Sequence, residues 1–99
     1  MLNITKTKEA AKLTVALAGR LDTTTSPELE KSLQESLSGV AELVMDLSGL
    51  EYISSAGLRV LLSAQKQMME QGSMKVTHVN ETVTEIFEIT GFADILTIE

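Results

Sequence analysis

Two adjacent serines, Ser54 and Ser55, stand where an apolar, strand-like run gives way to a run with helical spacing. Serine is a favoured N-cap residue, because its hydroxyl accepts a backbone N–H of the first helical turn. A helix start also carries free N–H groups and a partial positive charge, so the fold tolerates a phosphoryl group there. Phosphorylation adds a charge of about −1.5 to −2 at pH 7. One serine can therefore cap the helix while the other carries a phosphate that abolishes docking of a partner.

A serine can also act as a nucleophile when a neighbouring base activates it. The chain has one histidine, His78, in the segment SMKVTHV, and it has no Gly-x-Ser-x-Gly turn. A lone histidine on a strand is typical of a polar surface or core position. We therefore expect a protein that is not an enzyme, with an esterase-like pairing of Ser55 and His78 as the alternative.

Two aspartates lie next to predicted strand ends. Asp22 stands between a predicted strand and a predicted helix, and Asp46 is expected to end the central strand. Either carboxylate can be a turn residue that accepts hydrogen bonds from local backbone. Because parallel sheets gather such loops at one edge, Asp22 can instead be a surface acid near the two serines.

The composition limits the kind of partner. The 99 residues suit one small domain, 1–99, with a net charge of −6, two Phe, one Tyr and no Trp. An acidic surface repels phosphate backbones and anionic membranes, and base stacking needs aromatic rings that are scarce here. We expect no direct nucleic-acid partner and no membrane partner.

Other classes of site find little support. The chain lacks cysteine and has scattered carboxylates without ligand spacing, so the sequence indicates no disulfide, no metal and no cofactor. The N-terminal segment lacks the layout of a signal peptide, and no segment reaches the roughly 18 apolar residues of a membrane span. The expected location is the cytoplasm.

Alternation of apolar and polar residues predicts two strands, at 2–7 and 13–19, joined as a hairpin. A third strand at 40–48 is apolar on both faces, which predicts a central position in the sheet. Two more strands are expected, at 73–79 and at 94–99.

Helical spacing of apolar residues predicts three helices. The first has Ser26 as its N-cap, Pro27 as its first residue and Gly39 at its end. The second is expected from about Ser55 to Gln71, and the third over 80–91 with an asparagine cap and a glycine stop.

The predicted order is β-β-α-β-α-β-α-β, an α/β fold with a mixed, largely parallel sheet of four to five strands. One face of the second strand presents Thr14, Ala16 and Ala18, which are small or polar. The helices are therefore expected mainly on the other face of the sheet.

The segment VMDLSGLEYISSAGLRVLLSAQKQMMEQG closely resembles the central signature of the STAS-domain family of bacterial anti-sigma factor antagonists. The segment ALAGRLDTTTSPELE is similar to the family's Gly-x-Leu-Asp turn and first helix. The segment NETVTEIFEITGFADILTI is similar to its C-terminal helix, glycine and strand. The resemblance covers essentially the whole chain, in order.

The resemblance implies the STAS fold and a partner-switching function. The unphosphorylated antagonist would bind an ATP-dependent serine kinase that also serves as an anti-sigma factor, and this binding frees the sigma factor. Phosphorylation of the antagonist by that kinase would end the binding, and a serine phosphatase would restore it.

The resemblance also assigns roles to residues of this chain. Ser55 matches the phospho-acceptor, two positions before Gly57, and Ser54 stands where the family usually has aspartate, which makes it the second candidate. Asp22 matches the acid of the Leu-Asp turn at the kinase interface, and Ala56 replaces the usual Ser or Thr. These five residues are the implied partner-binding set. STAS domains also serve as constitutive adaptors, for example in stressosomes or lipid-transport complexes, and in that alternative Ser55 carries no switch.

Overall fold

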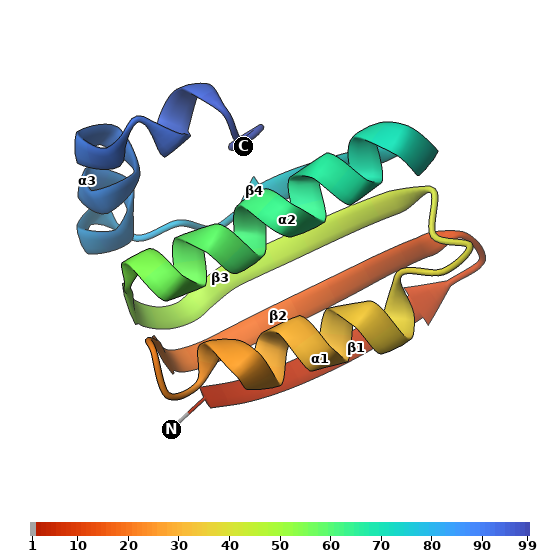
Figure 1. The fold of residues 1–99 in the computed structure, drawn as a ribbon, viewed down its shortest axis with the longest axis horizontal. Coiled ribbons are helices and arrows are strands. Elements are labelled where there is room, and N and C mark those ends of the chain that lie inside the picture. The colour runs from red at the N-terminus through yellow and green to blue at the C-terminus, as the bar shows by residue number, and fades with distance from the viewer. Residues whose placement is uncertain (1) are drawn as a thin grey trace.

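The computed structural model describes residues 2–99 as a four-stranded sheet with its helices on one face (Figure 1). The spatial order of the strands is β1-β2-β3-β4, with β1 antiparallel to β2 and the other neighbours parallel. The elements are β1 (Leu2–Glu9), β2 (Lys12–Leu21), α1 (Ser26–Ser36), β3 (Glu42–Ile53), α2 (Ser55–Gln71), β4 (Ser73–Thr77), α3 (Glu81–Thr90) and the 3-10 turn η1 (Phe92–Asp94). The mixed α/β fold, the hairpin and the central position of β3 are confirmed.

Alternation along β2 explains why the helices cover only one face of the sheet. Leu13, Val15 and Leu17 are each no more than 2% exposed and lie in the hydrophobic core. Their neighbours Thr14 and Ala16 point to the other face and are half-buried. In Figure 1, α1 and α2 lie side by side in front of the strands, and α3 lies at one end.

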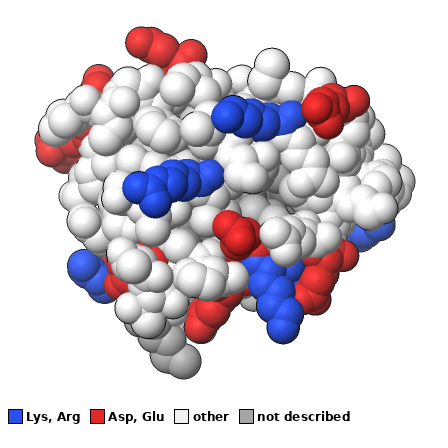
Figure 2. Space-filling model, viewed as in Figure 1, with Lys and Arg blue, Asp and Glu red and all other residues white. Residues whose placement is uncertain are grey.

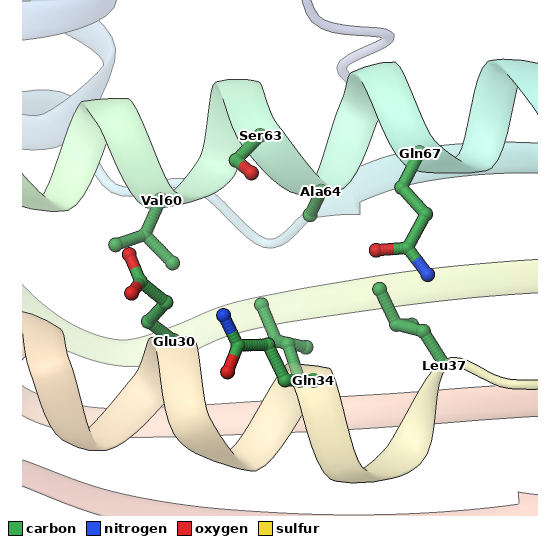
Figure 3. A pocket seen from close by; sticks show the side chains of 8 residues that line it. Glu30, Gln34, Leu37, Val60, Ser63, Ala64 and Gln67 are labelled. Atoms are coloured by element: carbon green, nitrogen blue, oxygen red, sulfur yellow. The ribbon is translucent and has the colours of Figure 1, made fainter.

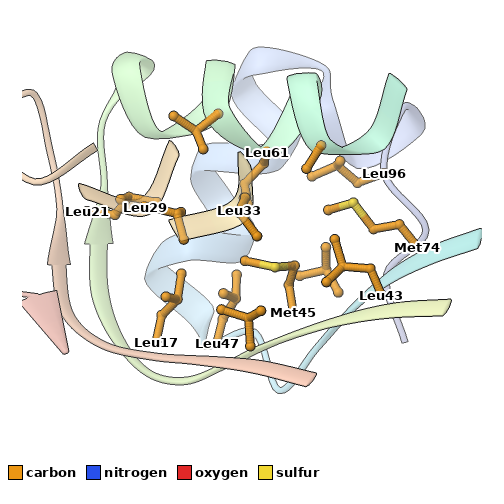
Figure 4. Packing of buried hydrophobic residues seen from close by; sticks show 14 of the residues in the cluster. Leu17, Leu21, Leu29, Leu33, Leu43, Met45, Leu47, Leu61, Met74 and Leu96 are labelled. Carbon is orange, nitrogen blue, oxygen red and sulfur yellow. The ribbon is translucent and has the colours of Figure 1, made fainter. Parts of the chain in front are cut away.

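The core lies between the sheet and the helices. Figure 4 shows Leu17 and Met45 of the sheet pointing toward Leu33 of α1 and Leu61 of α2. All four side chains are at most 3% exposed. Each buried aliphatic side chain of this size stabilises the fold by about 1.5–3 kcal/mol relative to an exposed one.

Strand β3 is longer than the sequence predicts, and the expectation that Asp46 ends it is wrong. The strand continues to Ile53 because its pairing with β2 resumes after irregularities in register, as Ala18 with Gly49 and Arg20 with Tyr52. Gly49 permits this pairing, since a Cβ there would lie 2.8 Å from the Cβ of Ala18. Because the two strands pair along this extra length, the end of β3 lies beside the end of β2, with Ile53 opposite Leu21.

The last predicted strand, 94–99, is also wrong. The chain forms η1 after Gly91, and only Ile98 pairs with the sheet, as an isolated bridge to Val76. Two backbone hydrogen bonds hold this bridge, from Val76 N–H to Thr97 and from Glu99 N–H to Val76. The N–H groups of Ile95 and Leu96 both donate to the carbonyl of Phe92, so the backbone turns where an extended strand was expected.

The helices follow the predicted positions with two corrections, both in α1. Helix α1 begins at Ser26 with Thr25 as its N-cap, so the prediction of Ser26 as the cap is wrong, and it ends at Ser36 rather than Gly39. Helix α2 has the predicted bounds, and α3 has the predicted asparagine cap and glycine stop. Within residues 2–99, none of the helices combines the length and apolar character that a membrane crossing requires.

Candidate functional site

The junction between β3 and α2 is attached to the end of β2. The backbone N–H of Ser54 donates to the carbonyl of Leu21 at 2.8 Å, and Ile53 and Leu21 are at most 1% exposed. Asp22 follows Leu21 directly, so the structure brings the Asp22 loop to the start of α2. The proximity that the sequence suggested for these two loops is present.

The two serines of this junction differ in what their side chains do. Ser54 is the N-cap of α2, in extended backbone conformation, and its Oγ accepts the backbone N–H of Gly57 at 3.4 Å. Ser55 is the first residue of α2, and its side chain is exposed. Ser54 therefore completes the helix end, while the Ser55 hydroxyl is open to a macromolecule that approaches this surface.

Gly57 sets how closely α2 approaches the sheet. The residue is buried, and a Cβ added there would lie 2.7 Å from Cγ of Leu21 and 2.9 Å from Cγ1 of Ile53. Real Cβ atoms do not occupy such positions unless the neighbours shift. The absence of a side chain at Gly57 thus lets the first turn of α2 rest on the ends of β2 and β3.

Asp22 is held in a tight turn by the residues that follow it. Its Oδ1 accepts the backbone N–H groups of Thr24 at 3.0 Å and Thr25 at 3.1 Å. The pKa of Asp22 lies below its ordinary value mainly because the carboxylate accepts the Thr25 N–H. Burial of the carboxyl raises the pKa and so opposes this shift. Further hydrogen bonds from Thr24 and Thr25 and the positive charge of Arg20 lower the pKa as well. The carboxylate is therefore an ionised turn residue, positioned beside the start of α2.

A hollow lies between the starts of α1 and α2. Thr23 and Pro27 line it from the α1 side, and Ala56 and Arg59 line it from α2. A second hollow continues between the two helices, with Gln34 on one wall and Ser63 on the other (Figure 3). The surface beside Ser55 is thus concave, and its walls carry polar, apolar and charged side chains, with Glu30 and Arg59 as the charged ones.

Both arginines of the chain belong to elements that meet at this junction. Arg20, near the end of β2, stacks on the ring of Tyr52 with 4.6 Å between its Cζ and the ring centroid. Arg59 lies on the exposed side of α2, one turn after Ser55. Figure 2 shows that acidic and basic side chains are interspersed on this side of the molecule, and some of them lie next to one another.

The esterase-like arrangement is not formed. His78 pairs instead with Asp46, with 3.4 Å between Nδ1 and Oδ1, on the uncovered face of the sheet. Strand β3 runs seven residues beyond Asp46 before Ser54, which at about 3.3 Å per residue is on the order of 20 Å. Ser55 and His78 are therefore not brought together. Among residues 2–99, no cluster of three or more His, Asp or Glu side chains could hold a metal ion.

Sequence reasoning missed some residues of this surface. Thr25 fixes the Asp22 turn, because its hydroxyl accepts the Asp22 N–H and donates to the carbonyl of Arg20, both at 2.9 Å. The signal for Thr25 was its place three residues after an aspartate, typical of a side chain that completes a turn. The signal for Arg59 was its spacing of four residues from Ser55 on a predicted helix.

Comparison with known proteins agrees with this fold. A family model described as "Mlab, STAS domain" matches residues 4–97. BtrV of Bordetella bronchiseptica is 36% identical over 96 residues, covering 95% of this chain and 83% of that protein. The anti-sigma-B factor antagonist of Bacillus subtilis is 30% identical over 98 residues, covering 98% and 90%.

The solved structures show the same fold. The anti-sigma factor antagonist SpoIIAA in its unphosphorylated form superimposes with a TM-score of 0.84 at 14% identity, over 98% of this chain and 88% of that one. The Bacillus SpoIIAA structure has also been solved in the phosphorylated form. The chain therefore belongs to the STAS domain family, and its relatives include anti-sigma factor antagonists.

Proposed function

We propose that this protein is an anti-sigma factor antagonist that phosphorylation of Ser55 switches off. The observation that carries the proposal is the division of roles at the start of α2: Ser54 accepts the cap hydrogen bond, and Ser55 is exposed. A modification of Ser55 therefore changes the surface without removing a contact that the fold needs. Relatives that are anti-sigma factor antagonists support the same function.

In the unphosphorylated state the surface around Ser55 docks on a serine kinase that also acts as an anti-sigma factor. Asp22, Ser54 and Ala56 form this surface with Ser55, because the Asp22 loop and the first turn of α2 are adjacent. Gly57 is buried and contributes by letting that turn rest on the strand ends. Occupation of the kinase by this protein releases the sigma factor. The concave region between the starts of α1 and α2 provides room for side chains of the kinase.

The switch is a single group transfer. The Ser55 oxygen bonds to the γ-phosphorus of ATP in the kinase, the bond from that phosphorus to ADP breaks, and the hydroxyl proton passes to a base of the kinase. The interface that accepted a neutral hydroxyl then faces a charge of about −1.5 to −2. Desolvation and repulsion of that charge cost several kcal/mol, and about 4 kcal/mol corresponds to a thousandfold loss of affinity.

A serine phosphatase reverses the switch by hydrolysis, which returns the Ser55 hydroxyl and releases inorganic phosphate. The sigma factor acts on transcription, and the kinase and phosphatase control it through Ser55 of this protein. We therefore place this protein in the cytoplasm. It supplies a hydroxyl and a docking surface, and it carries out no catalysis itself.

Gene replacement tests the proposal even before the partner kinase is identified. A strain with Ser55→Ala should express one set of genes more strongly than wild type, because the antagonist stays bound to the kinase. A strain with Ser55→Asp should express the same genes weakly, as a strain without the gene does. Ser73→Ala changes an exposed serine at the start of β4, at the other end of the sheet, and is the matched control, which should leave expression unchanged.

Two results would contradict the switch. Wild-type expression in the Ser55→Asp strain would show that negative charge at this position does not prevent docking. Unchanged expression in both Ser55 strains, together with a clear change in the deletion strain, would favour a constitutive STAS adaptor, in which the protein acts as a scaffold subunit whatever the state of Ser55.

A further inference from the structure

We propose that Arg59 is the internal counter-charge of the phosphoryl group on Ser55. In the phosphorylated protein the Arg59 guanidinium and the phosphate form an ion pair along the exposed side of α2. This inference rests on the proposed function, since it concerns the regulation of the same serine. Neither the family resemblance nor the similar proteins described above give Arg59 a role.

The spacing of the two residues is the first argument. Ser55 and Arg59 are both exposed and are four residues apart on one helix, so their Cβ atoms are about 5–6 Å apart on the same side. An acid that precedes a base by four residues is the more favourable order of such a pair. Phosphorylation of Ser55 creates this order where the unmodified protein has none.

The direction of the arginine side chain is the second argument. Side chains on a helix lean toward its N-terminus, so a residue covers the turn that precedes it. Arg59 lines the hollow at the start of α2 together with Ala56 and Thr23, which is consistent with this lean. The same lean brings the guanidinium within reach of the turn that carries Ser55.

The availability of Arg59 is the third argument. Arg20 is engaged with the ring of Tyr52, whereas within residues 2–99 Arg59 takes part in no ion pair or cation–π contact. Glu30 lines the same hollow without approaching Arg59 to within 4.0 Å.

The acidic side chains near the junction cannot pair with a phosphate, and Arg59 is the basic side chain that can. The Asp22 carboxylate is occupied by the backbone N–H groups of its own turn. Glu51 lies near the end of β3 and is exposed, so it carries charge of the same sign as the phosphate. Arg59 is therefore the basic group that α2 offers to Ser55 within one turn.

The chemistry of arginine suits this role. A guanidinium donates two parallel N–H bonds to phosphate oxygens, a geometry that a lysine ammonium does not reproduce. The pair also changes what a partner meets at this surface. Before phosphorylation Arg59 is free to contact the kinase, and after phosphorylation it is held by the phosphate, so one modification adds an anion and withdraws a cation.

Titration of the phosphate tests the pair directly. Phosphoserine is installed at position 55 of the full chain during translation, and the phosphorus-31 chemical shift is followed from pH 4 to pH 9. Because a nearby cation favours the dianion, Arg59→Gln should raise the second pKa of the phosphate by about half a unit. Lys66→Gln removes the same charge from the exposed side of α2 about two turns further on, and it should leave that pKa unchanged.

Two further measurements sharpen the test. Arg59→Lys keeps the charge but loses the parallel hydrogen bonds, so its phosphate pKa should fall between those of the parent and Arg59→Gln. In 1 M salt, where the Debye length is about 3 Å, most of the difference should disappear. Equal phosphate pKa values for the parent and Arg59→Gln in low salt would overturn the ion pair.

The titration tests the Arg59 ion pair independently of whether the proposed function is correct. The phosphoserine is installed without a kinase, so the titration reports on Arg59 even if cells never phosphorylate Ser55. Equal pKa values would remove Arg59 from the account and leave the switch untouched. Absence of phosphate on Ser55 in cells would remove the switch, whatever the titration shows.

Discussion

The Oγ of Ser54 accepts the backbone N–H of Gly57 at 3.4 Å, and this contact separates the tasks of two neighbouring serines. Ser54 is half-buried and completes the start of α2, and the next hydroxyl, on Ser55, is exposed. A structural hydroxyl and a modifiable hydroxyl thus stand side by side.

Ser54→Ala should lower the free energy of unfolding by about 0.5–1 kcal/mol, because a Gly57 N–H loses its acceptor. Ser55→Ala should change it by less than about 0.5 kcal/mol, since an exposed position at a helix start tolerates alanine. Urea denaturation of the two variants and wild type measures both values. Ser54→Asp retains an acceptor and is the matched control, with stability near wild type. A larger loss for Ser55→Ala than for Ser54→Ala would reverse the assigned tasks.

Gly57→Ala should destabilise the protein by about 1–3 kcal/mol, because the added Cβ would lie 2.7 Å from Leu21 Cγ and force the first turn of α2 away from the sheet. Thermal or urea unfolding measures the loss. Ser63→Ala, on an exposed part of the same helix, serves as the control for the change to alanine itself and should be neutral or slightly stabilising. Wild-type stability in Gly57→Ala would show that α2 does not rest on the strand ends as described.

Asp22 should contribute stability that depends on pH. Its carboxyl pKa is lower in the folded protein than the ordinary value of 3.8, mainly because it accepts the Thr25 N–H. The folded state therefore binds this proton less readily than the unfolded state does. The contribution is fully present above the ordinary value of 3.8, which applies to the unfolded chain, and is lost as pH falls through the lower folded pKa.

Asp22→Asn removes this titration and keeps an oxygen that can accept the same N–H groups. The difference in unfolding free energy between wild type and Asp22→Asn should therefore be constant from about pH 5 to pH 7 and shrink below about pH 4. Denaturation curves at a series of pH values give the difference directly. A difference that grows on acidification would mean that the folded pKa is raised rather than lowered.

The elements that the sequence predicted well are those with chemical signals at both ends. Helix α2 has a serine cap at its start and Gly72 after its last residue, and α3 has Asn80, whose Oδ1 accepts the Val83 N–H at 2.8 Å, and Gly91. These residue types act on the local backbone, so no tertiary information is needed to place them.

The extension of β3 beyond Asp46 could not be predicted in this way. Its middle contains Asp46, Ser48 and Gly49, which are typical of turns, and pairing with β2 overrides that local preference. The strand expected at 94–99 failed for the opposite reason. A turn closed by hydrogen bonds to the Phe92 carbonyl takes the place of extended backbone, and only Ile98 pairs with β4.

The candidate site was partly predictable. The sequence placed Ser54, Ser55 and Asp22 on neighbouring loops, because parallel strands bring their following loops to one edge. It left open which serine is the cap, since either hydroxyl could accept an N–H of the first turn. The backbone conformation at Ser54, which is extended, decides that question.

Mass spectrometry of the protein from its own cells tests the central claim most directly. Cleavage after Lys31 and Arg59 gives one peptide with both serines near its C-terminal end, and the fragment from Ser55 to Arg59 resolves the two positions. Our account predicts one phosphoryl group, on that fragment, in a part of the population that changes with growth and stress. Phosphate on Ser54 alone, or unmodified serines under every condition, would contradict the switch at Ser55.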